Sequence, residues 1–181
     1  MTAECTPSSP ASGHEPVTTR RDIVAAAVTL AATAGAVTLT PAAAQTPPVR
    51  HTNPPGMASP ATYSQVVEVN GPHRIVFLAG QTGQDANGKL APDGIRGQAT
   101  QIMENIKTAL ASVGGDFDHI VKLTSYLTDI EANAAAYREV RASYFPNKAA
   151  LPASTLLQIS RLANSAYLLE VEAVAILAPR A

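Results

Sequence analysis

The strongest hydrophobic pattern lies near the C-terminus, in residues 151–177, and it predicts two β-strands joined by a short connection. In the second strand, residues 166–176, side chains alternate with a period of two, so that neighbours point to opposite faces of a sheet. One face is apolar and suited to packing beneath helices: Tyr167, Leu169, Val171, Ala173 and Ala175. The opposite face is mixed: Leu168, Glu170, Glu172, Val174 and Ile176.

Two carboxylates, Glu170 and Glu172, stand two residues apart among the apolar neighbours of this mixed face. Carboxylates are rarely buried among apolar groups unless a partner compensates the charge. Two interpretations remain open. Either the carboxylates are paired across a contact between subunits, or one of them works as an acid or base.

The pattern upstream predicts five further elements. Strands are expected at residues 63–69 and 74–80, close enough to form a hairpin, and at residues 119–127. Apolar residues at three- and four-residue spacing predict a helix over residues 94–113 and another over residues 130–144. Asp93 and Asp129 precede these helices and are candidate N-caps.

The predicted order is β-β-α-β-α-β-β, which indicates an α+β fold. Two helices cannot cover both faces of such a sheet, so we expect both helices on one face of a mainly antiparallel sheet. The face left uncovered includes Leu168, Val174 and Ile176 beside Thr124, Leu156 and Glu170. A broad and partly apolar open face favours a partner surface. The pattern therefore predicts a homo-oligomer with Glu170 and Glu172 near its contacts.

The N-terminal part of the chain is read separately from the fold. Residues 1–44 resemble an export signal of the twin-arginine type, with the pair Arg20-Arg21, a modest apolar stretch and the small-residue cleavage site 42–44. Asp22 leaves the Sec route open, and a membrane anchor is the alternative to a cleaved signal. Residues 45–60 are Pro-rich and are interpreted as a flexible or extended leader. Residues 61–181 then form one domain.

Charge, cysteine content and short motifs set expectations about partners, location, metals and cofactors. The whole chain has a formal net charge of -1, and loss of the signal would leave it neutral, so nothing favours nucleic acid as a partner. Export predicts a periplasmic or otherwise exported bacterial protein without stable membrane insertion after cleavage. The single cysteine, Cys5, would leave with the signal. The scattered histidines do not indicate a metal site, and no glycine-rich phosphate loop indicates a nucleotide cofactor. We therefore expect no metal and no cofactor.

Several short segments, taken in order, resemble the RidA (YjgF-type) family of enamine/imine deaminases. The resemblance extends from about residue 60 to residue 177. It is carried by Tyr63-Ser64-Gln65, Ala79-Gly80-Gln81, residues 98–106, residues 121–124 and 127–129, Pro152-Ala153, Arg161-Leu162, and Glu170-Val171-Glu172-Ala173. It implies a chorismate-mutase-like fold and a homotrimer whose open sheets face inward, with three ligand pockets at the subunit interfaces.

The resemblance also implies a candidate site. Glu170 matches the glutamate that positions or activates the attacking water, and Glu172 is interpreted as structural. Tyr63, Ala79, Gly80, Ser154 and Leu156 are the predicted substrate-binding residues. In the deaminating branch an arginine stands where this chain has Ser154, and it binds the substrate carboxylate through two parallel hydrogen bonds. Ala79 likewise stands in place of a serine, and Thr62 in place of a proline.

Three arginines elsewhere are candidates to approach a carboxylate from a new direction: Arg138, Arg141 and Arg161. A solvated or ion-paired role is the alternative for each. Two functions stay open. The first is a protein that binds, and can hydrolyse, a small imine or enamine at subunit interfaces with release of ammonia. The second is a non-catalytic small-molecule-binding or protein-protecting module on the same trimeric scaffold.

Overall fold

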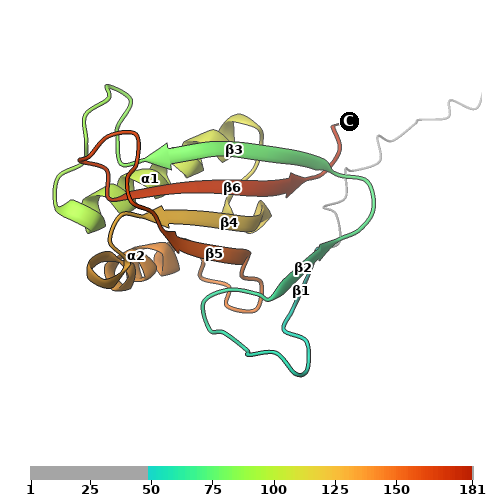
Figure 1. Ribbon diagram of the computed structural model, residues 1–181. Coiled ribbons are helices and arrows are strands. Elements are labelled where there is room, and N and C mark those ends of the chain that lie inside the picture. The colour runs from blue at the N-terminus through green and yellow to red at the C-terminus, as the bar shows by residue number, and fades with distance from the viewer. Residues whose placement is uncertain (1–48, 181) are drawn as a thin grey trace, which may run out of the picture. The chain divides into compact units, whose positions relative to one another are not determined.

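A computed structural model describes residues 49–180, and the predicted export signal therefore lies outside the described residues. One sheet has four strands in the spatial order β3-β6-β4-β5, and a second sheet has two strands, β1 and β2 (Figure 1). No helix within residues 49–180 is long and apolar enough to cross a membrane. The elements in chain order are β1 (Val49–Thr52), β2 (Val66–Val69), β3 (Arg74–Thr82), α1 (Gly94–Ser112), a 3₁₀ turn (Phe117–His119), β4 (Ile120–Leu127), α2 (Ile130–Tyr144), β5 (Ala153–Gln158) and β6 (Leu169–Leu177).

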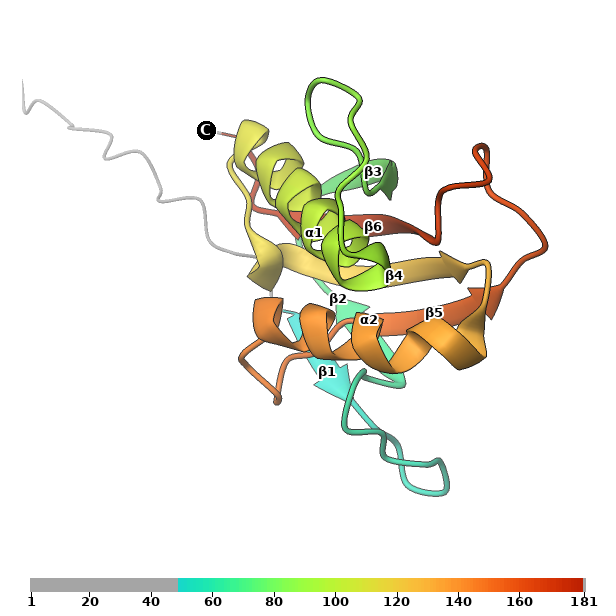
Figure 2. The ribbon, with the colours of Figure 1, turned by 90° about the vertical axis from the view of Figure 1, so that its left-hand side faces the viewer.

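Both α-helices cover the same face of the four-stranded sheet (Figure 2), which confirms the predicted α+β arrangement. The period-two pattern of β6 explains why. Leu169 and Val171 are fully buried against the helices, whereas Glu170 and Glu172, which alternate with them, are only half-buried. Helix α1 fills the same core with a stripe of apolar residues at helical spacing: Ile102, Met103, Ile106 and Leu110.

The sheet is mainly antiparallel, as predicted. Strand β6 pairs antiparallel with both β3 and β4, and β5 pairs parallel with β4. Because parallel neighbours need a crossover connection, helix α2 lies between β4 and β5 in the chain and packs over them. The two strands predicted from residues 151–177 are therefore not neighbours, since β4 separates β5 from β6.

The hairpin predicted for the N-terminal part of the domain is wrong. Strand β2 does not form a hairpin with β3; it pairs antiparallel with β1, which lies inside the predicted Pro-rich leader. Val49–Thr52 is too short to show an alternating pattern, and prolines flank it, so sequence periodicity did not reveal it. A contact across the chain supports its position, because His51 Nδ1 lies 2.8 Å from the carbonyl oxygen of Leu151.

Helix boundaries depend on local chemistry. Helix α2 begins as predicted after Asp129, whose carboxylate accepts a hydrogen bond of 3.0 Å from the backbone N–H of Ala132. Asp93 precedes α1 in the left-handed conformation, with φ of 67°, and its side chain makes no capping hydrogen bond. The predicted role of Asp93 as a side-chain N-cap is therefore wrong, although the helix begins at the expected position.

The expectation that Leu156 belongs to the open face is also wrong. Leu156 pairs with Ser125, which points toward the helices, and it packs against the core. Ile176 lies opposite Ile75 on the predicted face, although only 5% of its surface is exposed. The side chains that the open face does carry include Phe77 and Ile75, which are 78% and 52% exposed. The uncovered, partly apolar face predicted from the sequence is thus present, with β3 as its most exposed strand.

Candidate functional site

The predicted site residues of β5 lie on the helix side of the sheet. Ser154 and Leu156 alternate to the same face and line a pocket of about 250 Å³ with Tyr63 and with the side chains of α2. We call it the arginine pocket; its lining is Thr62, Tyr63, Tyr137, Arg138, Arg141, Ser154 and Leu156. Three of the predicted binding residues, Tyr63, Ser154 and Leu156, are therefore brought together.

Hydrogen bonds from its neighbour Ser64 hold Tyr63 at this position. The backbone N–H of Ser64 donates to the carbonyl oxygen of Pro152 at 3.1 Å, and its hydroxyl donates to that of Leu151 at 2.6 Å. Ser64 is buried, so neither bond is exchanged readily with water. The segment before β2 is in this way joined to the segment that leads into β5, and Tyr63 comes to lie beside Ser154.

Helix α2 contributes a buried polar pair to the same pocket. Tyr137 is almost completely buried, and its hydroxyl lies 2.6 Å from that of Ser125 in β4. Burial raises the pKa of Tyr137 above its ordinary value, although the bond to Ser125 and the nearby Arg141 act in the opposite direction. The site prediction did not include Tyr137; its helical spacing from Ala134 and Arg141 is the sequence signal that could have found it.

Arg141 is the least expected residue of the pocket. Only 7% of its surface is exposed, and its Nη2 donates to the carbonyl oxygen of Thr62 at 2.8 Å. Its guanidinium carbon lies 5.7 Å from the ring centre of Phe145. Its Nε is buried without a hydrogen-bond partner among the described residues, a state that costs about 1–3 kcal/mol. The cation is thus held in place without a complementary anion.

The charge on Arg141 is not balanced by its neighbours. No ion pair within residues 49–180 involves Arg141 or Arg138. Burial, together with repulsion from Arg138, lowers the pKa of Arg141, yet a guanidinium remains charged at neutral pH. A smaller adjoining hollow is lined by the same two arginines and by Lys148. No acidic side chain among residues 49–180 lines either space, so the described part of this site is positively charged.

Glu170 lies elsewhere, on the open face, against the backbone of β3. If residue 80 carried a Cβ atom, that atom would stand 2.0 Å from Glu170 Oε1, so only glycine fits there beside this carboxylate. The pairing of β3 with β6 shifts register between Leu78 and Gln81, which places Ala79 and Gly80 in a bulge. Glu170 forms no ion pair within the part of the chain that the structure describes.

The second carboxylate of β6 has a partner in its own chain. The hydroxyl of Tyr126 in β4 donates to Glu172 Oε1 at 3.1 Å. This hydrogen bond raises the pKa of Tyr126 above its ordinary value. Lys122 also faces this side and donates to the hydroxyl of Thr155. Glu172 thus belongs to a polar network of the sheet, which agrees with its predicted structural role.

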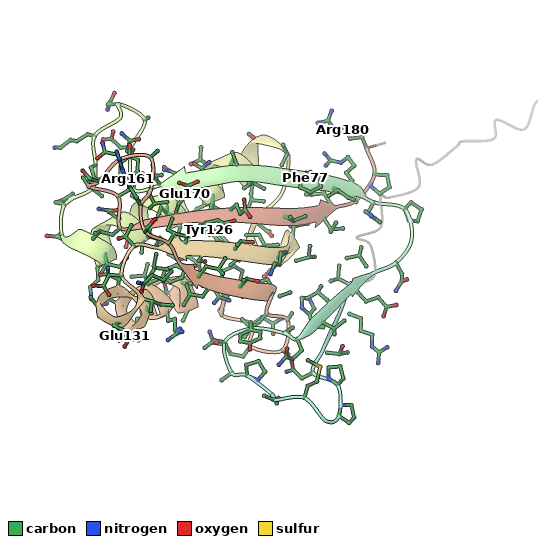
Figure 3. All side chains as sticks on the ribbon, viewed as in Figure 1. Phe77, Tyr126, Glu131, Arg161, Glu170 and Arg180 are labelled. Atoms are coloured by element: carbon green, nitrogen blue, oxygen red, sulfur yellow. The ribbon has the colours of Figure 1, made fainter. Side chains whose placement is uncertain are left out.

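Within one chain the predicted site residues therefore form two groups rather than one. Glu170, Ala79 and Gly80 lie on the open face, which faces the viewer in Figure 3, where Glu170, Tyr126 and Phe77 are labelled. Tyr63, Ser154 and Leu156 lie in the arginine pocket on the helix side. Arg161 is exposed and lines neither group. No cluster of potential metal ligands occurs among residues 49–180.

The sequence profile of the family described as Endoribonuclease L-PSP matches residues 55–177. The chain belongs to this family, the RidA (YjgF-type) family. Protein DfrA of Myxococcus xanthus is 36% identical over 115 residues, which are 63% of this chain and 84% of that protein. The human 2-iminobutanoate/2-iminopropanoate deaminase is 35% identical over 126 residues, which are 69% of this chain and 85% of the human protein.

Solved structures confirm the RidA-family fold. The crystal structure of YyfB from Yersinia pestis, described as a protein of unknown function of the conserved Rid family, has a TM-score of 0.65. It shares 30% sequence identity, and the alignment covers 71% of this chain and 98% of that one. Yeast Mmf1 gives a TM-score of 0.54 at 28% identity, over 70% of this chain and 93% of Mmf1. The two-helix, mainly antiparallel architecture is thus the architecture of the family.

Proposed function

We propose that this RidA-family protein binds a small imine or enamine and hydrolyses it, releasing ammonia, at sites completed between copies of the chain. The observation that carries the proposal is the position of Glu170. Its carboxylate stands on an uncovered sheet face, without an ion-pair partner in residues 49–180, against a glycine that leaves room for it. The names of the mammalian relatives, which are imine deaminases, support the same reaction.

The exposed apolar residues of the open face support self-association of the chain. Phe77 and Ile75 expose 78% and 52% of their surface in the single chain, and Leu157 of β5 exposes 42%. Covering such side chains with a second copy removes apolar area from water, which stabilises the contact. A neighbouring copy would also add side chains opposite Glu170, which neither α1 nor α2 covers. We propose the homotrimer that the family resemblance implies.

The chemistry needs only water and one positioned carboxylate. An enamine first takes a proton on carbon and becomes the imine. Water then adds to the carbon of the protonated imine while Glu170 accepts a proton from that water. The Glu170 carboxyl returns this proton to nitrogen. When the C–N bond breaks, Glu170 accepts the remaining proton of the hydroxyl group, and a carbonyl compound forms. That proton passes to the departing ammonia, which leaves as ammonium and so carries the positive charge of the protonated imine. Atoms and charges balance without an oxidant or a reductant.

The test generates 2-aminoacrylate and 2-iminopropanoate in solution and follows their decay to pyruvate and ammonia. We expect the full chain to accelerate the decay, and Glu170→Gln to abolish the acceleration while leaving the circular dichroism spectrum unchanged. Glu172→Gln is the matched control, since its carboxylate already has Tyr126 as a partner. Equal rates for the wild type and Glu170→Gln would show that Glu170 does not carry the reaction.

The second candidate is a non-catalytic binding or protein-protecting module, and Ser154 is the observation that favours it. A serine hydroxyl cannot form the two parallel charged hydrogen bonds of a guanidinium, so residue 154 cannot bind a substrate carboxylate as the arginine of the deaminating branch does. Ligands that raise the melting temperature without being converted would support the binding module. Turnover of any of these ligands would exclude the binding module. The variant Ser154→Arg, assayed in parallel, shows whether restoring the arginine is enough to give imine hydrolysis.

We also propose that residues 1–44 direct export. The support is the pair Arg20-Arg21 followed by a modest apolar stretch and a small-residue cleavage site. Fractionation of a bacterial host that produces the full chain is the test, with replacement of both arginines by lysine as the matched variant. Periplasmic protein from the wild type alone indicates the twin-arginine route. Export of both forms indicates the Sec route, and retention of both in the cytoplasm refutes the proposal.

A further inference from the structure

The arginine pocket has positive charge, space and free donors, but no anion. We propose that Arg141, together with Arg138, binds the carboxylate of a small organic acid in this pocket, from the side of helix α2. The identity of the acid rests on the proposed function, which supplies an imino acid or its carbonyl product. Anion binding itself does not depend on turnover.

Charge is the first argument. A buried cation is retained in a protein when it is paired or when it serves a ligand. Arg141 is 7% exposed, and within residues 49–180 it makes one hydrogen bond, from Nη2 to the carbonyl oxygen of Thr62. A neutral carbonyl oxygen satisfies one of its five N–H donors and none of its charge. Arg138, one helical turn earlier, adds a second positive charge to the same lining rather than an acid.

Space is the second argument. The pocket encloses about 250 Å³, room for a ligand of a few heavy atoms. Ser154 lies in its wall, and its short side chain leaves this volume open. A long cationic side chain at position 154 would enter the same space and be repelled by the two arginines of α2. The pocket can therefore hold Arg138 and Arg141 because residue 154 is small and neutral. A third cation at position 154 would be repelled by the other two.

The type of anion follows from the remaining groups. A planar guanidinium presents N–H groups in a fork that matches the two oxygens of a carboxylate. The hydroxyl-bearing side chains of Tyr63 and Ser154 share the lining and can donate to the same anion or to a neighbouring carbonyl oxygen. Leu156 supplies an apolar wall for a short carbon chain. This combination suits a 2-oxo or 2-imino acid of three or four carbons.

Isothermal titration calorimetry of the full chain with pyruvate tests the proposal. We expect saturable binding of pyruvate, and binding at least about tenfold weaker of pyruvamide, which has the same shape without the charge. Absence of pyruvate binding, or equal binding of the amide, overturns the proposal. Tighter binding of inorganic phosphate than of pyruvate overturns the choice of a carboxylate.

Two substitutions locate the site. Arg141→Lys keeps the positive charge but loses the two parallel N–H groups of the guanidinium. Arg138→Met removes an exposed cation that makes no hydrogen bond to the described residues, so we expect this variant to fold. We expect each to weaken pyruvate binding by about tenfold or more. Arg180→Met, at an exposed arginine after β6 (Figure 3), is the matched control and should leave binding unchanged. Unchanged binding in both pocket variants contradicts the assignment.

Rescue separates a ligand contact from a structural role of Arg141. If Arg141 served only to hold Thr62, a new arginine at position 154 would not restore the binding lost in Arg141→Met. We expect the double variant Arg141→Met/Ser154→Arg to regain pyruvate binding, because the pocket then again holds two cations and the new guanidinium takes the place of the lost one. Failure of the rescue, with folding intact by circular dichroism, counts against a shared carboxylate position.

The outcome is distinguishable from that of the proposed function. Pyruvate binding that depends on Arg138 and Arg141, without any acceleration of imine decay, refutes the hydrolase and leaves the anion site. Imine hydrolysis by a protein that shows no saturable pyruvate binding refutes the anion site and leaves the hydrolase. Imine hydrolysis that depends on Glu170, together with pyruvate binding that depends on Arg138 and Arg141, supports both.

Discussion

The two faces of the four-stranded sheet differ in how completely one chain supplies their contacts. On the helix side, β6 buries Leu169 and Val171 completely beneath α1 and α2. On the other side, the same strand presents Glu170 and Glu172, and its neighbour β3 exposes Phe77. Strand β6 thus contributes to the buried core with one face and to the uncovered surface with the other. Its period of two separates the residues of the two faces.

The comparison teaches where to look for function. On the helix side almost every group has a partner, and the exception is Arg141, whose Nε is buried and unpaired in the described part of the chain. On the open side most groups lack partners, and the exception is the network of Tyr126 and Glu172. Arg141 in α2 and Glu170 in β6 are therefore candidates for different roles. We propose that Arg141 binds a ligand within one chain, whereas the site of Glu170 also needs side chains from a second chain.

Truncation of a buried side chain on the helix side should have the largest effect on the free energy of unfolding. Leu169→Ala leaves a cavity under both helices, and we expect the free energy of unfolding to fall by about 2–5 kcal/mol. Leu157→Ala on the open side, where the side chain is 42% exposed, is the matched control and should cost much less. Urea denaturation measures both, and equal losses would contradict the difference between the two faces.

A charge introduced on the open side should instead weaken the association between copies of the chain. We expect Phe77→Asp to shift the protein to the monomer in sedimentation velocity, because the substitution places a carboxylate in the proposed contact. The helix-side core should persist, with an unchanged circular dichroism spectrum. Met57→Asp introduces the same charge at an exposed apolar residue outside this sheet and should leave the sedimentation coefficient unchanged. An unaltered oligomer in Phe77→Asp would place the contact elsewhere.

The bulge of β3 offers a smaller and more local perturbation. Gly80→Ala brings a methyl group within 2.0 Å of the present position of Glu170 Oε1, so the carboxylate must move. We expect a loss of about 1–3 kcal/mol in stability and a fall in imine hydrolysis of at least tenfold. The shorter side chain in Gly80→Ala/Glu170→Asp should recover the stability. A single variant as stable as the wild type would show that Glu170 moves aside without cost.

The smallest effect is expected at the surface between the helices. Tyr144 donates to Glu104 at 2.8 Å, and burial with this hydrogen bond raises the pKa of Tyr144 from 10.0 to about 12. A raised pKa in the folded state means that the stabilisation is complete below pH 10 and is lost as the pH rises through 12. Tyr144→Phe should cost less than about 1 kcal/mol at neutral pH. The difference from wild type should vanish at alkaline pH, and Tyr167→Phe is the control.

Sequence reasoning succeeded where one periodicity governed a long element. Helix α2 has the predicted bounds, 130–144, because Asp129 caps it and a stripe of inward residues runs along it. Strand β6 has the predicted inward face because Leu169, Val171, Ala173 and Ala175 alternate without a break. The sharing of one face by both helices followed from counting elements rather than from any single residue.

It failed where pairing depends on residues distant in the chain. Strand β1 is four residues long, and only its partner β2 and the contact of His51 with Leu151 define it. Leu156 was assigned to the open face because a parallel register with β4 cannot be read from alternation alone. Arg141 was a candidate to approach a carboxylate, with a solvated or ion-paired role as the alternative. Its burial and its lack of an anion became visible only when α2, β5 and the segment before β2 were placed together.

The position of β6 has a consequence for how the chain folds. β6 follows every other strand in the sequence, yet it lies between β3 and β4 and forms the hydrogen bonds that join them. Until its residues are available, β3 has no partner in the four-stranded sheet. Domains tend to fold from the N-terminal side during synthesis, but this sheet cannot. The ribosome must finish nearly the whole domain before the sheet can close, and a chain cut short before Leu169 should be unable to fold.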